Sequence, residues 1–582
     1  MPHSLPKYAA TPAQRGTRHP GSRLVPWILA AALAGCGGGS EGGGGGGSTP
    51  PEAGEPFRVT DTVPVNTLLG YGEERPQMSF LAYIRSEQAG GDILWGTDLG
   101  LPVTLPNAGA GGADLTLFLF GDTDQLDLDW LEQTHKVRKL QPAAAGGILG
   151  PAGPFEGDAI GRTTDADPSD GVHLDHVYRN VEPGDPMPVC ADPGVRADGF
   201  RPVYLAGVHG TEIKLPAQIP PACVQVLPNT TPTGAWVVDG TVFMLAAVQK
   251  DDEPDNGLSY LAASRDQGLH WTVLNGGRPF SERGRSARFI HGFGVSVDAS
   301  DYQDPQRSGP CLLPLPKGGD TRGILLFGSG LWKYPGNNVY LAFFSRSELQ
   351  AAAADPNRRL TAWYFAGTDR RIDGHTACWS QSEQDAVPVV RVDDLSAYAR
   401  FEQACGAAPT SAGIGYTSVI HVDETLVDGR RIDRLVMLLS PAYQGVGPDG
   451  PFDADLGTVL ITGDPLRPWI WNLKVPESGF DGRPPAERRF RPLPVAAAPT
   501  SGLMANEPHC KQSGIAWGTV SGYAPLLIDR YTRRSADGLG VDLYFLISRS
   551  NVLRHPDDPQ PDLEIAYHYV VDVMRTTLRP LP

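Results

Sequence analysis

The sequence predicts an all-β fold, specifically a five-bladed β-propeller. Glycine (70 residues) and proline (54 residues) exceed a fifth of the 582-residue chain, and long runs of helical period are scarce. Five strand-rich regions recur at intervals of roughly 80 to 110 residues, which suits propeller blades of about four strands each. An assembly of several sandwich sheets is the alternative. The five regions are Leu101–Phe120, Ala235–Ala263, Ile324–Ser345, Tyr416–Ser440 with Thr458–Thr462, and Tyr523–Ser548.

The two ends of the globular part are expected to meet in one blade. Glu564–Leu578 alternates apolar and polar residues well enough for a final strand. Pairing this strand with the chain near Phe57 would remove an exposed sheet edge. The propeller domain is therefore expected to span residues 57–582 and to close its ring with both chain ends.

An eight-residue turn gives a sharper indication of a propeller. Ser264–Trp271 (SRDQGLHW) matches the S-x-D-x-G-x-x-W pattern of the Asp box, a turn that recurs in sialidase-like propellers. In such a turn the polar side chains bind the loop backbone, the glycine allows the reversal and the tryptophan packs against the blade. We therefore expect a structural role for Asp266. The best helix candidate, Ser347–Ala354 with Ser347 as its cap, is expected to be a surface insertion.

Residues 1–35 are predicted to be a lipoprotein signal peptide. Four basic residues and no acidic residue accompany a short apolar core, Leu24–Leu33, which falls short of the roughly 20 residues of a membrane span. Leu33–Cys36 (LAGC) resembles the bacterial lipobox, which implies cleavage before Cys36 and a lipid on that cysteine. An ordinary secretory signal with an incidental cysteine is the alternative.

Residues 36–56 are predicted to be a flexible Gly-rich tether. The globular part is thus expected to be extracytoplasmic, at the outer membrane or cell surface, with the lipid as its only contact with the membrane, and to be a monomer. Loss of the signal peptide takes the formal net charge from −17 to −21. Without a Lys/Arg-rich run, so acidic a protein is not expected to bind nucleic acid.

Six cysteines remain besides Cys36, an even number typical of disulfides in an exported protein. Nearness in sequence favours pairing Cys190 with Cys223 and Cys378 with Cys405, among the 15 pairings that six cysteines permit. No CxxC or HExxH spacing occurs, so neither a metal nor another cofactor is expected.

The stretch Gly96–Thr123 is expected to carry the active site. It predicts an antiparallel hairpin of two strands, Leu101–Pro106 and Leu115–Phe120, with Asp98 just before the first and Asp122 just after the second. Because antiparallel strands start and finish at one edge, the hairpin brings the two carboxylates together. The alternative is that both aspartates only cap turns.

A second acidic group follows the hairpin. Asp158, Asp165 and Asp167 could line a sugar site or bind a cation through oxygen ligands. The alternative is a solvated loop, because the segment is rich in turn-forming residues.

Other side chains are candidates for contact with a substrate. His291 could orient a carboxylate or a hydroxyl group, and Trp236 and Tyr523 could stack on sugar faces, although such residues are more often structural. Glu383 is a reserve candidate for an acid. No serine or cysteine nucleophile motif occurs, which disfavours esterase and protease chemistry.

Several segments carry a family resemblance through their order along the chain. They are GTDLG with LFLFGDT, Asp158–Asp175, Phe327–Gly330 with Asn338–Ala342, Trp363–Gly367, and Met574–Leu578. Together they resemble a bacterial β-propeller family first catalogued as a domain of unknown function and later associated with endo-acting D-arabinanases. The resemblance covers residues 90–578 and implies that Asp98 and Asp122 lie in a pocket. Long insertions such as Tyr443–Lys511 depart from the pattern and bear on substrate preference.

The resemblance implies a glycoside hydrolase that degrades a furanose-containing polysaccharide, as an endo-D-arabinanase does. That chemistry needs two carboxyl groups flanking the scissile bond, here Asp98 and Asp122. The more enclosed carboxyl is expected to act as the acid, because burial raises the pKa of a carboxyl group. A propeller that binds glycans or proteins without turnover is the alternative.

Overall fold

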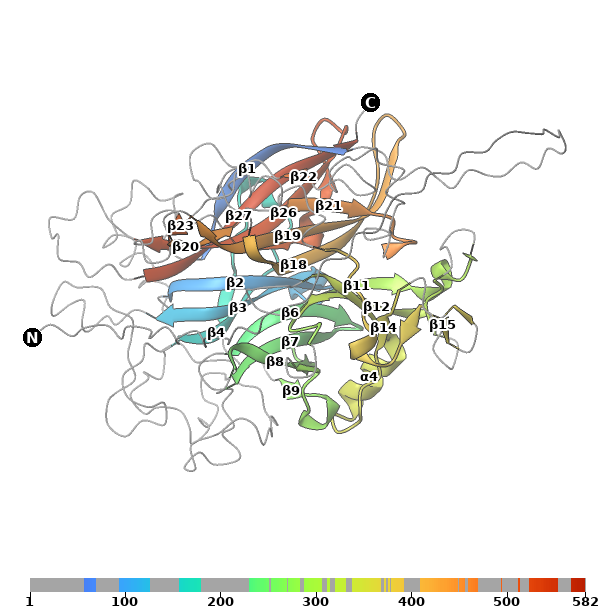
Figure 1. Ribbon diagram of the computed structural model, residues 1–582. Coiled ribbons are helices and arrows are strands. Elements are labelled where there is room, and N and C mark those ends of the chain that lie inside the picture. Colours follow the sequence, from blue (N-terminus) through green and yellow to red (C-terminus); the bar gives the residue numbers. More distant parts are fainter. Residues whose placement is uncertain are drawn as a thin grey trace, which may run out of the picture. The chain divides into compact units, whose positions relative to one another are not determined.

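The computed structural model describes twenty segments of the chain, all within one compact unit, Pro51–Pro582 (Figure 1). They are residues 57–69, 94–125, 156–178, 230–250, 253–268, 271–282, 287–305, 311–314, 320–330, 338–367, 371–372, 375–376, 378–391, 409–447, 450–455, 459–468, 493–494, 511–512, 523–552 and 567–580. The predicted signal peptide, Cys36 and the tether lie outside the described residues. Among the helices described, none is long and apolar enough to cross a membrane.

Five antiparallel sheets follow one another along the chain, and we number them as blades 1 to 5. Blade 1 has the order β2 (Leu94–Leu105), β3 (Leu115–Gln125), β4 (Glu156–Thr163) and β5 (His176–Tyr178). Blade 2 has the order β6 (Thr230–Val238), β7 (Thr241–Lys250), β8 (Glu253–Ser264) and β10 (Ser281–Glu282), with β9 (Thr272–Val273) beside β8.

Blades 3 and 4 are built in the same way from larger sheets. Blade 3 has the order β11 (His291–Asp298), β12 (Arg322–Ser329), β13 (Tyr340–Ser345), β14 (Trp363–Phe365) and β17 (Trp379–Ser380). Blade 4 contains β18 (Pro409–Thr425), β19 (Arg431–Gly447), β21 (Val459–Gly463) and β22 (Leu493–Pro494). Strand β20 (Gly450–Asp455) pairs with the far half of β19, and β23 (Lys511–Gln512) pairs with β20. A separate two-stranded ribbon joins β15 (Arg371–Ile372) to β16 (His375–Thr376).

Blade 5 joins the two ends of the domain. Its order is β24 (Tyr523–Leu527), β26 (Val541–Val552), β27 (Tyr567–Pro580) and β1 (Phe57–Leu69), with β25 (Arg533–Arg534) beside β26. Strand β1 pairs with β27 from Phe57 opposite Pro580 to Leu69 opposite Val571. The predicted ring closure by both chain ends is therefore confirmed.

The first strands of the five sheets contact one another in a closed cycle. Strand β2 contacts β6, β6 contacts β11, β11 contacts β18, β18 contacts β24, and β24 contacts β2. Each of the five predicted strand-rich regions lies in a different sheet of this cycle. The fold is thus the predicted five-bladed β-propeller, and each blade has its innermost strand on the ring.

Apolar side chains fill the spaces between blades. One buried cluster includes Leu546 of blade 5, Leu117 of blade 1, and Val242 and Tyr260 of blade 2. Burying each such large apolar side chain contributes about 1.5–3 kcal/mol to folding. Packing across the blade boundaries therefore stabilises the ring as one unit.

The Asp-box turn has the structural role expected from its sequence. The Ser264 hydroxyl donates to Asp266 Oδ1 (2.8 Å) and accepts from the backbone N–H of Gly268 (2.8 Å). Gln267 and Gly268 both have positive φ angles, which make the reversal, and Trp271 is buried in the core. Asp266 thus stabilises a turn between β8 and β9.

Two local predictions are wrong. The helix is α4 (Arg346–Ala354), and its cap is Ser345, whose hydroxyl accepts from Glu348 N–H, rather than Ser347. It is also not a loose surface insertion, because Leu349 and Ala352 are buried against blades 2 and 3. An apolar contact every three to four residues fixes a helix face in this way.

The predicted disulfide between Cys378 and Cys405 is also wrong. Cys378 is bonded to Cys311, 67 residues earlier, with Cα atoms 5.4 Å apart. Cys311 lies in the connection between β11 and β12, and Cys378 directly precedes β17. Folding of blade 3 brings these two segments together, which their distance in sequence could not reveal. The predicted pair Cys190 and Cys223 lies outside the described residues.

Candidate active site

The innermost strands all begin on one side of the ring, which we call the strand-start side. Buried hydroxyls near these beginnings link one blade to the next. Thr233 Oγ1 of blade 2 donates to Ile290 O (2.6 Å), and Ser418 Oγ of blade 4 donates to Pro525 O (2.9 Å). The opposite side, where the innermost strands end, is the strand-end side.

Three of the predicted aspartates lie at one level on three adjacent strands of blade 1, at the strand-start side. Asp98 of β2 is the register partner of Gly121, which precedes Asp122 in β3. On the other side of β3, Asp158 of β4 lies between the partners of Thr123 and Phe120. The predicted hairpin is present and places Asp98, Asp122 and Asp158 at one level of three adjacent strands, while the approach of their carboxylates to one another stays a prediction.

The two strands are longer than expected, so both aspartates lie inside strands rather than beside them. Gly121 and Asp122 form a bulge, because these two residues of β3 face only Asp158 on β4. A bulge bends its strand and changes the direction of the side chains around it, and bulges are frequent beside active sites. The irregularity therefore falls at the level of the blade where the three acidic residues lie.

The backbone next to Asp98 is strained. Leu99 has a φ angle of 68° and Gly100 one of 90°, and both residues are buried. A left-handed conformation is ordinary for glycine but unfavourable for leucine. The Leu99 N–H donates to Ser548 Oγ of blade 5 at 2.7 Å. Strain of this kind persists where surrounding structure enforces it, and it is concentrated at functional sites.

Blade 2 approaches the same bulge closely. A Cβ added to Gly121 would lie 2.8 Å from Thr231 Cγ2 and 3.3 Å from Pro232 Cδ. Only glycine fits at this position, so the glycine beside Asp122 serves close packing of two blades.

Tyr523 and His291 also lie on the strand-start side. Tyr523 begins β24 and is the register partner of Ser548, next to the strained turn at Leu99. His291 begins β11, is buried, and has its ring centre 4.3 Å from that of Tyr416. Burial lowers the pKa of His291 to about 3, because desolvation disfavours the charged imidazolium. His291 is therefore neutral at pH 7, which suits it to orienting other groups rather than to donating a proton.

Trp236 occupies the core, not a surface that a sugar could reach. Its ring is buried and stacks with those of Phe243 (6.1 Å between centres) and Phe344 (6.4 Å) at the boundary of blades 2 and 3. Trp236 is thus a core residue and not a sugar-stacking one.

Asp165 and Asp167 are not brought to the other aspartates. They follow the end of β4, where Thr163 is the register partner of Thr116 near the start of β3. From the level of Thr116 to that of Gly121 is about 17 Å at 3.3 Å per residue. Both carboxylates accept hydrogen bonds within the turn, and Arg533 also contacts Asp167. Asp165 and Asp167 therefore stabilise a turn, as the alternative of a solvated loop rich in turn-forming residues predicts.

Glu383, the reserve acid, joins blade 3 to blade 2. Its carboxylate accepts from the Ser281 hydroxyl and from the Arg288 N–H (2.7 Å). Burial raises its pKa, while these hydrogen bonds oppose the rise. Its partners make it a structural group, distant in sequence and blade from the hairpin.

Ser548 and Leu99 are functional candidates that the sequence did not indicate. A left-handed leucine has no signal in the sequence, and one buried serine among many has none either. Within the described residues, no three His, Cys, Asp or Glu side chains are grouped so as to hold a metal ion.

Two solved structures are similar to parts of this chain. One is Penicillium chrysogenum α-L-arabinanase complexed with arabinobiose, at 13% identity over 60% of this chain and 93% of that chain, with a TM-score of 0.21. The other is a mutant α-L-arabinofuranosidase from Fusarium graminearum in complex with an iminosugar inhibitor, at 10% identity over 60% and 93%, with a TM-score of 0.20. No family model matches this chain, and no curated protein matches its sequence.

Proposed function

We propose that the protein is a glycoside hydrolase that cleaves a furanose-containing polysaccharide, with Asp98 and Asp122 as its catalytic carboxylates. The observation that supports the proposal is that they lie at one level of adjacent strands beside a bulge, with Asp158 on the third strand. Acid and base chemistry on a glycosidic bond requires two carboxyl groups close enough to flank it. This arrangement supplies both from one rigid blade, which is how precise sites are built.

In this mechanism one aspartate protonates the leaving oxygen, and the other activates water or attacks the sugar carbon. The carboxyl that is further from water acts as the acid, because desolvation raises its pKa. Asp158 and Tyr523 would contact the sugar from the strand-start side. His291, which is buried, would orient neighbouring groups as a neutral imidazole, given its lowered pKa.

The enzyme would act from a membrane surface. Cleavage before Cys36 and lipidation of that cysteine would leave a tether of about 20 residues, whose root-mean-square reach is roughly 25 Å. That reach would hold the monomeric propeller clear of the lipid headgroups while a polymeric substrate remains accessible. Cys36→Ser should release a soluble, active protein, and a variant that stays in the membrane fraction after a salt wash would contradict the anchor.

A panel of polysaccharides tests the proposed activity. The wild type is expected to release reducing sugar from at least one arabinan or other furanose-containing polymer. Asp98→Asn and Asp122→Asn should each lower kcat by at least about 100-fold, which is typical for loss of an acid or base group, with Tm nearly unchanged. Full activity in both variants would rule out the assigned roles. A wild type that binds a polysaccharide without cleaving any would instead establish the binding-module alternative.

A further inference from the structure

Hydrogen bonds to hydroxyl groups cross four of the blade boundaries near the strand-start side. In three of them a threonine or serine donates to a carbonyl of the next blade: Thr233 to Ile290, Ser329 to Gly415, and Ser418, which also accepts from the Leu527 N–H, to Pro525. Across the boundary of blades 5 and 1, Ser548 Oγ accepts from the N–H of Leu99 at 2.7 Å. Only this bond ends on a residue with a left-handed backbone directly after a predicted catalytic aspartate.

Ser548 lies between two strained turns. It is fully buried, and its register partners are Tyr523 on β24 and Val571 on β27. Leu99, its hydrogen-bond donor, has a φ angle of 68°, and Ala524, next to its partner Tyr523, has one of 52°. Both are fully buried residues other than glycine. One serine thus connects the irregular beginnings of two innermost strands.

The hydroxyl compensates for an unfavourable backbone. A leucine with positive φ places its Cβ too close to its own carbonyl oxygen, and its buried N–H is directed at Ser548 Oγ. A buried N–H without an acceptor is also unfavourable, and Ser548 Oγ removes that penalty only while Leu99 keeps this conformation. The serine therefore selects the left-handed turn over extended alternatives.

We propose that Ser548 is a positioning residue for Asp98, which it fixes at the strand-start side through the backbone of Leu99. The inference rests on the proposed function in assigning Asp98 to catalysis. A shift of about 1 Å in a catalytic group can lower a rate by up to about 100-fold. Loss of the Ser548 hydroxyl should therefore impair the chemical step more than substrate binding.

The test compares Ser548→Ala with Ser418→Ala in the full chain. Ser418 is the matched control, because it is also fully buried and links two blades, donating to Pro525 O and accepting from Leu527 N–H. Hydrogen exchange measured by mass spectrometry should accelerate at least tenfold in the peptide containing Leu99 for Ser548→Ala. In Ser418→Ala the acceleration should occur in the peptide containing Leu527.

The kinetic readout uses a polysaccharide that the wild type cleaves. Ser548→Ala should lower kcat about tenfold or more with KM changed by less than threefold, whereas Ser418→Ala should keep kcat within twofold of the wild type. Ser548→Cys, which keeps the shape of the serine side chain with a slightly larger atom that accepts hydrogen bonds weakly, serves if the alanine variant does not fold. Equal kcat values in the variants of Ser548 and Ser418 would overturn the positioning role.

The exchange measurement separates this inference from the proposed function. A wild type that cleaves nothing would refute the proposed function, and with it the catalytic part of the inference. Accelerated exchange at Leu99 in Ser548→Ala would still support the serine as the group that fixes the turn. Unchanged exchange at Leu99 would refute that role, whatever the activity.

Discussion

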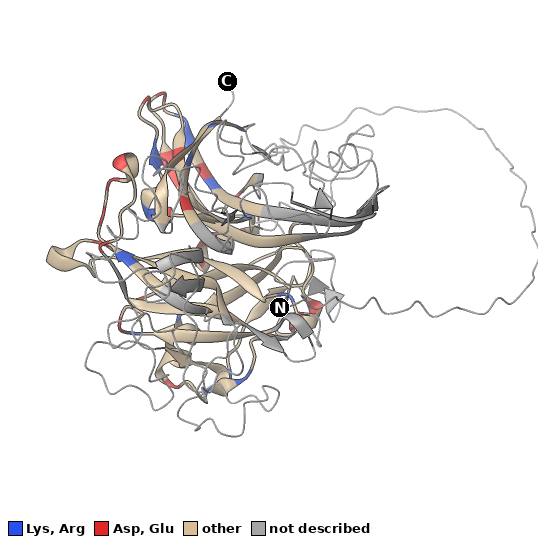
Figure 2. Cartoon of the chain, turned by 90° about the vertical axis from the view of Figure 1, so that its left-hand side faces the viewer, with Lys and Arg blue, Asp and Glu red and all other residues tan. Residues whose placement is uncertain are grey.

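The two sides of the ring hold their aspartates in different ways. On the strand-end side, the turn that follows each innermost strand contains a carboxylate with hydrogen-bond partners among the described residues. These carboxylates are Asp114 with Asn107 N–H, Asp239 with Arg346 and Gln350, Asp298 with Ser300, Asp428 with Arg430, and Asp537 with Ser535 and Leu539 N–H. Figure 2 shows acidic and basic residues close together at such hairpin ends.

On the strand-start side of blade 1, the irregularity is in the backbone instead. Asp98, Asp122 and Asp158 lie at one level of three strands beside a bulge, and a left-handed leucine follows Asp98. Short polar side chains that bind their own turn are ordinary turn chemistry and need no function. Strain that is enforced by a neighbouring blade has no such explanation, so it is the better guide to a site.

The largest expected effect on kcat comes from neutralising aspartates on the strand-start side, and the matching substitutions on the strand-end side serve as the comparison. Asp98→Asn and Asp122→Asn should lower kcat by at least about 100-fold. Asp165→Asn and Asp167→Asn, on the strand-end side, should keep kcat within about threefold. Parallel assays on one cleavable polysaccharide, with Tm as the control for folding, make the comparison. If kcat fell as much in the Asp165 variant as in the Asp98 variant, both sides of the ring would take part in the reaction. The contrast between a reactive and a structural side would then be wrong.

The sequence was sufficient for the features that depend on local pattern. Alternating strands and their spacing predicted five blades, and antiparallel pairing within one hairpin predicted that Asp98 and Asp122 lie at one level of adjacent strands. Asp158 and Asp165 lie only seven positions apart, yet β4 carries the chain from one side of the blade to the other between them. In the sequence these residues form one acidic cluster, but in the fold they lie at opposite ends of β4.

Features that depend on contacts between blades could not be predicted. The left-handed backbone of Leu99 depends on a hydrogen-bond acceptor, Ser548 Oγ, that blade 5 supplies. The disulfide between Cys311 and Cys378 depends on the folding together of two connections of blade 3. The sequence allowed Trp236 to stack on a sugar or, as is more usual, to lie in the core, and its contacts with the rings of Phe243 and Phe344 show that it lies in the core. Long-range packing, rather than propensity, settled each case.

Two glycines with positive φ allow the strain on the two sides to be compared by stability. A Cβ on Gly100 (φ 90°) would lie 2.8 Å from Phe120 Cε1 and 3.0 Å from Leu546 Cδ1, whereas one on Gly111 (φ 69°) would meet nothing within 4 Å. Gly100→Ala should therefore lower the free energy of unfolding by about 2–5 kcal/mol, from backbone strain plus overpacking. Gly111→Ala should lower it by about 1–2 kcal/mol. Urea denaturation measures the free energy of unfolding of both variants. Equal decreases in the two variants would show that side chains on the strand-start side are not packed more closely around the backbone.

Acid titration tests how firmly the strand-end carboxylates are held. The Leu539 N–H, the Ser535 hydroxyl and Arg579 lower the pKa of Asp537 from its ordinary 3.8 to about 2. A depressed folded-state pKa means that this carboxylate stabilises the fold above pH 3.8, and that the contribution is lost as pH falls from 3.8 through about 2. Thermal denaturation between pH 5 and 2 should show a shallower acid loss for Asp537→Asn than for the wild type. Identical pH profiles would contradict the pairing.

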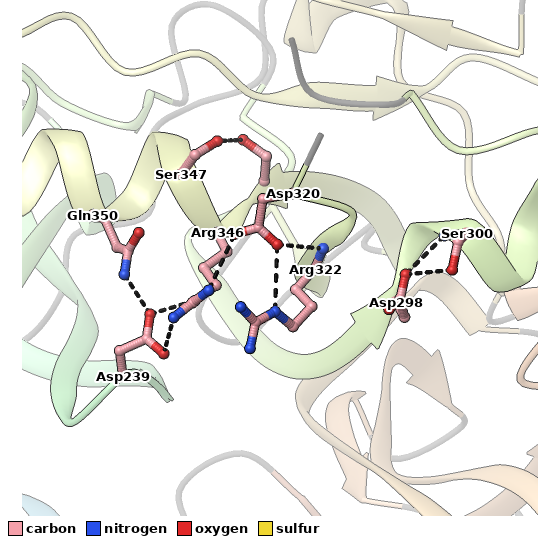
Figure 3. A network of polar contacts seen from close by, with 9 residues as sticks. Asp239, Asp298, Ser300, Asp320, Arg322, Arg346, Ser347 and Gln350 are labelled. Carbon is pink, nitrogen blue, oxygen red and sulfur yellow. Dashed lines mark hydrogen bonds and ion pairs between the residues drawn. The ribbon is translucent and has the colours of Figure 1, made fainter. Parts of the chain in front are cut away.

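The smallest expected effect concerns an arginine that joins two blades on the strand-end side. Arg346 of α4 contacts Asp239 after β6 and Asp320 before β12, while Gln350 also contacts Asp239 and Arg322 contacts Asp320 (Figure 3). The guanidinium is partly exposed, so Arg346→Ala should lower Tm less than Gly100→Ala does.

Arg346→Lys keeps the charge but loses the planar fork that spans two carboxylates, so its Tm should fall between those of the wild type and Arg346→Ala. Added salt should narrow the difference between wild type and Arg346→Ala, because it screens exposed ion pairs. Neither variant should change kcat, since the network lies on the side away from Asp98 and Asp122. A fall in kcat without a fall in Tm would show instead that the strand-end side takes part in the reaction, and the division between a structural and a reactive side of the ring would fail.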